Sequence, residues 1–83
     1  MEIREVFARN LRTLRQAKGL SQEELAHQAG LDRTYISALE RNVYNASIDV
    51  VDRLAEVLGV DATELLKRPK AGLRRSKSEP NNR

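Results

Sequence analysis

The stretch SQEELAHQAGLDRTYISALER, residues 21–41, most constrains what this chain can fold into. Two short helix-like runs meet at Gly30, and short helices are poorly stable alone in water, so they must pack together. Ala26 is small enough for two helices to cross closely, and Gly30 can take the positive φ of a tight turn. Four apolar residues would then face one core: Leu25, Leu31, Ile36 and Leu39. This spacing predicts a helix-turn-helix unit, which directs the start of its second helix toward the major groove of DNA.

Apolar periodicity predicts another helix before this unit. Its stripe recurs every three or four residues: Ile3, Val6, Phe7, Leu11 and Leu14. Gly19 ends this first helix, because glycine tolerates the left-handed conformation of a C-terminal cap. Ser21 and Glu24 then form a capping box, which predicts a second helix over 22–29 that stops at Gly30.

Similar signals mark two later helices. Asp32 can cap a third helix over 33–41, and Asn42 is a plausible left-handed stop. A fourth helix starts at Ser47 and ends at Gly59. Its residues expected to face inward are Ile48, Val51, Leu54, Ala55 and Leu58.

The last predicted helix is short and precedes a change in composition. Asp61 and Glu64 form a box-like start for a fifth helix that ends near Lys67. No alternating strand pattern appears, so we expect an all-α, compact five-helix domain over 1–68. Residues 69–83 have almost no apolar side chains and are expected to form a disordered basic tail.

Composition excludes several classes of function. The 83 residues contain no Cys, which excludes disulfides and thiolate metal sites, and the lone His27 is expected on the outer face of the second helix. No histidine stands beside a plausible nucleophile, so we expect no catalysis, cofactor or metal. The first helix carries charges throughout, which argues against a signal peptide or a membrane span and favours a soluble, cytoplasmic protein.

Charge is distributed unevenly along the chain. Residues 1–66 hold 8 Lys/Arg and 11 Asp/Glu, whereas residues 67–83 hold 7 Lys/Arg and 1 Glu. Five acidic residues alternate with apolar positions on the fourth and fifth helices: Asp49, Asp52, Glu56, Asp61 and Glu64. We interpret them as a solvated outer face that points away from DNA. The tail can neutralise phosphates without carrying sequence information.

The stretches NLRTLRQAKGLSQEELA, LDRTYISALERN and VDRLAEVLGVDATELL resemble the Cro/C1-type (XRE) helix-turn-helix repressors. The resemblance spans about residues 3–67, and GLDRTYISALERN is most similar to the small controller proteins of restriction–modification systems. One departure is Ala46, where many relatives have Pro. The resemblance implies a lambda-repressor-like fold and a homodimer that binds double-stranded DNA at a palindromic operator.

Candidate DNA contacts follow from the motif and the resemblance. In the family, the Gln22 position contacts a phosphate, and Ser21 can both cap the helix and touch phosphate. Arg33, early in the recognition helix, suits bidentate bonding to guanine, although it could instead be solvated or paired with Asp32. Tyr35 could contact DNA or pack against the domain. The other candidates are Thr34, Ser37, Arg41, Asn42 and Asn45, whereas Ala38 is too short to reach far.

Two further sets are expected to be structural. The resemblance implies a partly buried ion pair between Arg15 and Glu40. Val50 and Val57 are apolar but lie off the main stripe, so with Leu66 they are candidates for a dimer interface. No effector-binding domain is evident, and we expect no small-molecule effector. A protein-interaction module, such as an antitoxin whose DNA binding is secondary, stays open as the alternative function.

Overall fold

The computed structural model describes residues 2–69 and contains five helices and, over that range, no strand. The helices are α1 (Ile3–Ala17), α2 (Gln22–Ala29), α3 (Arg33–Glu40), α4 (Ile48–Leu58) and α5 (Ala62–Leu66). The predicted all-α, five-helix fold is therefore confirmed. No helix within 2–69 is long and apolar enough to cross a membrane. The predicted tail lies, except for Pro69, outside the described residues.

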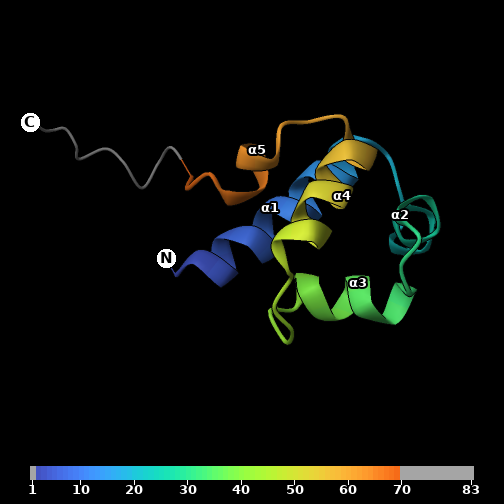
Figure 1. Ribbon diagram of the computed structural model, residues 1–83, viewed down its shortest axis with the longest axis horizontal. Helices are drawn as coiled ribbons and strands as arrows, with labels where there is room; N and C mark the ends of the chain where they lie inside the picture. The colour runs from blue at the N-terminus through green and yellow to red at the C-terminus, as the bar shows by residue number, and fades with distance from the viewer. Residues whose placement is uncertain (1, 70–83) are drawn as a thin grey trace, which may run out of the picture.

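The five helices pack as two groups that meet in one core (Figure 1). α2 packs on α3 at one end of the domain, and α5 packs on α1 and α4 at the other. α1 also packs on α3, and α4 packs on α2, so these two contacts join the groups. α3 lies along one edge of the domain, with no helix on its outer side (Figure 1). The helix-turn-helix pair is thus anchored on its inner side only.

Local hydrogen bonds explain why α2 and α3 begin and end where they do. The Ser21 hydroxyl accepts from the Glu24 amide at 3.0 Å, and the Glu24 carboxylate accepts from the Ser21 amide at 2.8 Å. At the end of α2, Gly30 has φ 69°, and the amide of Leu31 donates to the carbonyl of Ala26 at 2.8 Å. This left-handed cap closes the turn that sends the chain into α3.

The end of α3 uses the same motif without a glycine. Asn42 has φ 59°, and the amide of Val43 donates to the carbonyl of Ala38 at 2.8 Å. Asparagine tolerates this left-handed conformation better than other side chains do. The prediction that Asn42 stops the third helix is confirmed, although the helix ends at Glu40 and not at residue 41.

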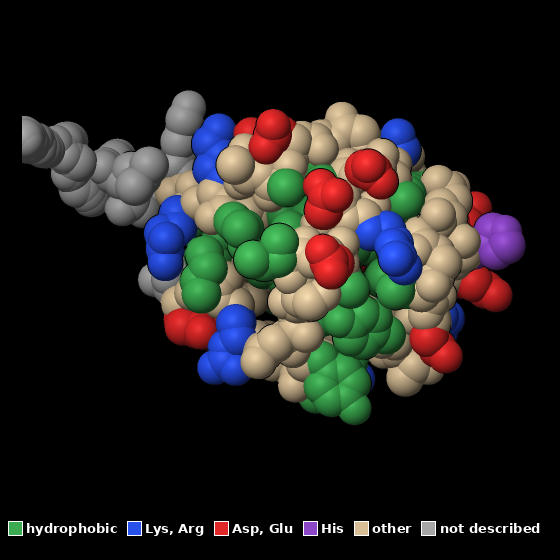
Figure 2. Space-filling view, in the orientation of Figure 1, with side chains coloured by type: hydrophobic (Ala, Val, Ile, Leu, Met, Phe, Trp, Pro, Cys, Tyr) green, Lys and Arg blue, Asp and Glu red, His purple; other side chains and the backbone are tan. Residues whose placement is uncertain are grey.

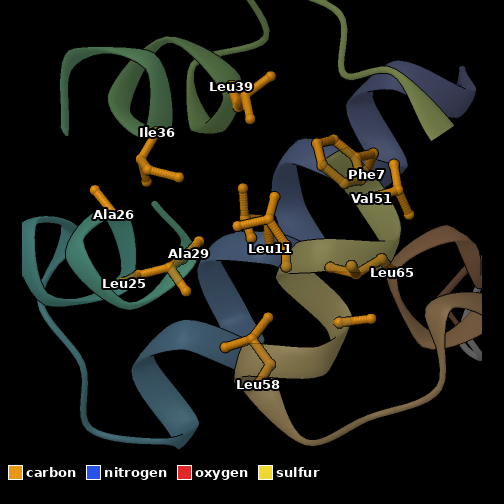
Figure 3. Close-up of a cluster of buried hydrophobic side chains, with 12 residues drawn as sticks. Phe7, Leu11, Leu25, Ala26, Ala29, Ile36, Leu39, Val51, Leu58 and Leu65 are labelled. Atoms are coloured by element: carbon orange, nitrogen blue, oxygen red, sulfur yellow. The ribbon is translucent and has the colours of Figure 1, made fainter. Parts of the chain in front are cut away.

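One apolar core joins the helices (Figure 3). Its largest fully buried side chains are Leu11, Leu25, Ile36, Leu39, Leu54, Leu65 and Val6. Ala26 is 2% exposed, as expected for a small residue where α2 and α3 approach closely. Leu31, which was expected in the core, is half-buried and packs against it. The helix-turn-helix pair therefore shares its core with α1, α4 and α5.

Two apolar residues predicted to face inward do not. Ile48 is 86% exposed and Ile3 is 41% exposed. Each is the first residue of its helix. The apolar stripe of the helix includes this residue, but no neighbouring helix covers it. The periodicity predicts the stripe correctly but does not predict how much of it a neighbouring helix covers.

The start of α5 also differs from the prediction. The Asp61 carboxylate accepts from the amide and the hydroxyl of Thr63, at 3.0 and 2.8 Å. Glu64 instead faces Lys67, 3.8 Å from its Nζ atom, so no capping box forms. Asp61 alone satisfies the first turn of this short helix.

Candidate nucleic-acid interface

The first turn of α3 is the exposed part of the recognition helix. The Asp32 carboxylate accepts from the Thr34 amide at 2.8 Å, which fixes where the helix starts. Arg33 and Thr34 are exposed, whereas Ile36 and Leu39 are buried in the core. The two polar side chains thus project from a helix that is held rigidly by its opposite face. Among residues 2–69, Arg33 makes no salt bridge, so the alternative pairing with Asp32 is absent.

Ala38 does not belong to this outward face. It is 3% exposed, although it lies one turn after Thr34. Both α1 and α2 pack on α3, and the exit turn folds back to bond its carbonyl, so the buried arc of the helix is wide. Ser37 is half-buried and marks the edge of the accessible strip. The outward strip of α3 is therefore narrower than the sequence indicated.

Tyr35 connects the recognition helix to the loop that follows it. Its ring is half-buried against the core, and its centroid lies 6.2 Å from that of Tyr44 at an interplanar angle of 39°. Such a tilted aromatic pair contributes modestly to stability. Tyr44 itself is 58% exposed. Tyr35 therefore has a packing role, which its partial burial and its contact with Tyr44 both support.

Glu40 links three of the predicted residues. Its carboxylate accepts from Arg15 Nε at 2.6 Å and from a second guanidinium nitrogen at 3.0 Å. Its Oε1 atom also accepts from Gln22 Nε2 at 3.1 Å. The Glu40 side chain is 3% exposed, and its hydrogen bond raises the pKa of Arg15 above the ordinary value. The expected ion pair is present, and it also orients Gln22 at the start of α2.

One N–H of the Gln22 amide remains available for an outside acceptor. The nitrogen carries two donors, of which the bond to Glu40 uses one. Gln22 is half-buried and Ser21 is exposed, both at the N-terminal end of α2, where backbone dipoles favour an anion. Ser21 and Gln22 thus lie next to each other at this end of α2, with one free N–H on the Gln22 amide.

The first residues of the loop after α3 have backbone amides that are already hydrogen-bonded. The amides of Arg41, Asn42 and Val43 all donate to carbonyls of α3. The side chains of Arg41, Asn42 and Asn45 are exposed. The backbone N–H groups of these three residues are therefore not free to meet a phosphate, because closing the end of α3 uses them. Asn45 is oriented by Arg4, whose guanidinium donates to Asn45 Oδ1 at 3.1 Å.

A family model for helix-turn-helix (HTH_3) domains matches residues 11–65. The chain belongs to this helix-turn-helix family. A hypothetical transcription factor of Neisseria meningitidis serogroup B is 48% identical over 73 residues, covering 88% of this chain and 69% of that protein. The crystal structure of a hypothetical transcription factor from Neisseria, also 48% identical, has a TM-score of 0.82 over 88% of this chain and 84% of that one.

Two other solved relatives extend the similarity. The restriction–modification controller protein C.AhdI from Aeromonas hydrophila is 45% identical, with a TM-score of 0.72 over 75% of this chain and 94% of that one. SinR, a master regulator for biofilm formation, was solved in complex with DNA; it is 35% identical, with a TM-score of 0.71 over 74% of this chain and 98% of that one. These relatives confirm the resemblance. The chain is a DNA-binding helix-turn-helix transcriptional regulator and not an enzyme.

A group of acidic residues lies on or beside α4 and α5 of this regulator. All five acidic residues predicted for the outer face are exposed: Asp49, Asp52, Glu56, Asp61 and Glu64. Figure 2 shows acidic side chains spread over α4, with a basic residue among them. Within residues 2–69 no three His, Asp or Glu side chains come together in a way that could hold a metal ion. His27 is exposed, as expected.

Some of these contacts could not be expected from the sequence. The bond between Gln22 and Glu40 joins residues 18 positions apart, and the bond between Arg4 and Asn45 joins residues 41 apart. Asn10 of α1 donates to the carbonyls of Leu65 and Lys67, at 3.0 and 2.8 Å, and so satisfies the end of α5. Each depends on how helices meet, which no local motif encodes.

Proposed function

We propose that this regulator binds a palindromic operator as a homodimer, with α3 of each copy in the major groove and the start of α2 on the DNA backbone. The observation that carries this proposal is the exposed first turn of α3 on a helix whose other face is buried. One copy presents few side chains to base edges, so useful specificity requires two. The two recognition helices would then lie about 34 Å apart, one turn of DNA. Such a protein acts in the cytoplasm, where its DNA is.

We assign base contacts to the first turn of α3. Arg33 has the charge and the planar geometry to bond both O6 and N7 of guanine. Thr34 can meet a thymine methyl group or a base edge. Tyr35 and Ser37, which are half-buried, are assigned to the rim of the contact. Specificity would therefore depend on Arg33 more than on any other residue.

We assign the remaining candidates to the DNA backbone. They are Ser21, Gln22, Arg41, Asn42 and Asn45, which lie at the start of α2 or in the loop after α3. Contacts with phosphate position a protein on DNA and carry no sequence information of their own. Loss of one of these side chains should weaken binding to all sequences alike.

For the dimer, we favour the surface around the start of α4. A shallow groove of about 190 Å³ lies there, and its lining includes Ile3, Ile48 and Leu66. These three residues are 41%, 86% and 42% exposed. Apolar side chains exposed together in this way are typical of a surface that binds another molecule. Figure 2 shows hydrophobic side chains gathered beside α4. A second copy covering this groove would bury them.

The other two candidates for the dimer contact are less favoured. Val50 and Val57 are half-buried and already pack against the core. They are interspersed with exposed acidic residues on α4, so a two-fold contact centred on them would bring like charges together. Leu66 is common to both versions of the interface.

Selection of bound duplexes from a random library tests the proposal. A palindromic consensus with half-sites about 10 base pairs apart supports it, and a single half-site or no enrichment refutes it. Arg33→Ala should cost about 1–3 kcal/mol of specific binding and relax one base position. Gln22→Ala should instead weaken all sequences evenly. An unchanged consensus with Arg33→Ala would contradict our placement of α3.

The second candidate function is a protein-interaction module, such as an antitoxin. The exposed apolar groove at the start of α4 favours it, because the groove could hold another protein in place of a second copy. Gel shifts on the gene's own upstream region separate the two. Specific binding at nanomolar concentration supports a regulator of transcription, and binding of no duplex supports the interaction module.

A further inference from the structure

A groove runs between α1 and the C-terminal end of α3. Its volume is about 440 Å³, and it is open to solvent. Three arginines line it: Arg9 and Arg12 from α1, and Arg41 from the end of α3. All three are exposed. Asn42, whose side chain we assign to the DNA backbone, lines the same groove.

The groove has an excess of free positive charge. Among residues 2–69, none of its three arginines forms a salt bridge. Two glutamates also line it, Glu5 and Glu40. The Glu40 carboxylate is occupied by Arg15 and Gln22, and Glu5 accepts the amide of Glu2 at the start of α1. Neither acid is paired with the arginines, so the groove suits an anion.

The position of the groove indicates which anion. On one side it is continuous with the loop after α3, through Arg41 and Asn42. On the other side it reaches Glu40, whose carboxylate bonds the side chain of Gln22 at 3.1 Å. The groove therefore borders the loop after α3 on one side and, through Glu40, the start of α2 on the other. Duplex DNA carries one negative charge for about every 1.7 Å of its axis, so a duplex that contacts both places presents phosphates near the groove.

We propose that Arg9 and Arg12 contact DNA phosphates, so that α1 extends the backbone interface beyond the helix-turn-helix pair. This inference rests on the proposed function, since it requires α3 to lie in the major groove. Arginine is suited to the role, because its planar fork bonds phosphate oxygens in pairs. The contact adds affinity for any sequence and no preference among sequences.

The salt dependence of binding tests this proposal. Affinities are measured between 50 and 200 mM salt on two labelled 30-base-pair duplexes, one selected by the wild-type protein and one of scrambled sequence. Arg9→Gln/Arg12→Gln should reduce the slope of log K against log salt by about 1.8 on both duplexes, because each phosphate that is no longer neutralised lowers it by about 0.9. Over this range the wild type should lose about 12-fold more affinity than the variant. The selected consensus should not change.

Two matched variants separate charge at this groove from charge in general. Lys18→Gln/Arg53→Gln removes two positive charges elsewhere and should leave the slope at the wild-type value. Arg9→Lys/Arg12→Lys keeps the charge and should retain most of the slope. Circular dichroism and thermal melting verify that each variant is folded. If the glutamine variant does not fold, the single variants Arg9→Gln and Arg12→Gln should each reduce the slope by about 0.9.

The outcomes distinguish this proposal from the proposed function. A wild-type protein that binds no duplex would refute the proposed function. A wild type that binds, with equal slopes for the glutamine and control variants, would overturn the α1 contact alone. A glutamine variant that keeps the slope but no longer self-associates in sedimentation would show that the groove receives an acidic surface of another copy, which also overturns the proposal.

Discussion

Replacing Glu40 with glutamine should destabilise the domain and also weaken DNA binding, for two separable reasons. Glu40→Gln keeps the shape of the side chain but removes the charge that faces Arg15. The guanidinium of Arg15 then has only the carbonyl of Leu20, at 2.8 Å, as an acceptor of full strength. The new amide group also points its N–H donors at an existing donor, either Arg15 Nε or, in the other orientation, Gln22 Nε2. The site would be left with surplus donors and an unpaired charge.

The burial of the pair sets the size of the effect. The side chains of Arg15 and Glu40 are 10% and 3% exposed, and removing one partner of a buried ion pair costs about 3–5 kcal/mol. Arg15 retains some access to water, so we expect the lower value, about 3 kcal/mol. A domain of this size has a total stability of about 3–10 kcal/mol. The melting temperature should therefore fall by about 12–24 °C.

A repaired variant separates stability from positioning. Arg15→Met/Glu40→Leu replaces the pair with apolar side chains and should return to within about 1 kcal/mol of the wild type, because it leaves no charge unpaired. Gln22 would still be without the acceptor that orients it. DNA affinity should therefore remain about 2–10-fold lower, which corresponds to one hydrogen bond. Adding Gln22→Ala to this variant should cause little further loss.

Urea denaturation followed by circular dichroism measures the stabilities, and fluorescence anisotropy with a labelled duplex measures the affinities. A Glu40→Gln variant within 0.5 kcal/mol (roughly the effect of an ordinary surface change) of the wild type would refute the energetic argument. A repaired variant that binds DNA as well as the wild type would refute the positioning of Gln22. The two results are independent, so each part of the reasoning can fail alone.

Three other changes test the interface, the exit turn and a helix cap. Ile48→Asp should give folded monomers in sedimentation at micromolar concentration. Val43→Asp changes an exposed apolar residue outside the apolar groove at the start of α4, and it should leave the dimer intact. Asn42→Ala should lower the unfolding free energy by about 1 kcal/mol because of its positive φ, and Asn42→Gly should not; equal losses would exclude backbone strain as the cause. The Ser21 amide holds the pKa of Glu24 below its ordinary value of 4.5, so this carboxylate contributes stability above about pH 4.5 that is lost as the pH falls through the lowered pKa. Between pH 6 and pH 3, urea denaturation should show a smaller loss of stability for Glu24→Gln than for the wild type.

The helices could be predicted well because their signals are local. Ser21, Asp32 and Ser47 each cap a helix within three residues of themselves, and Gly30 and Asn42 take the left-handed conformation that their positions require. A chain of this size has few ways to bury several short amphipathic helices. The fold therefore followed once their ends and apolar stripes were known.

The sequence did not predict in the same way which residues a neighbouring helix covers, or which side chains of different helices come into contact. Ile48 has the spacing of a core residue, but nothing in the sequence says that α4 begins beyond its neighbours. Arg9 and Arg12 look like solvated residues of α1, and only the packing of α1 on α3 brings them beside Arg41. The sequence predicted that Gln22 contacts the DNA backbone, but it did not predict the hydrogen bond from Gln22 to Glu40. That bond depends on how α2 packs against α3.

The narrow outward strip of α3 limits the number of base pairs that one copy of this protein can distinguish. Because Ala38 is buried and Ser37 is half-buried, Arg33 and Thr34 are the exposed residues of the helix. Each good contact with a base distinguishes the correct base by about 1–3 kcal/mol, so one copy can discriminate only a few base pairs. In the complex that we propose, a large share of the affinity would then come from phosphate contacts on either side of the strip. Phosphate contacts give the same affinity for every DNA sequence. A dimer doubles the number of base contacts and so raises the affinity for the correct sequence above this uniform level.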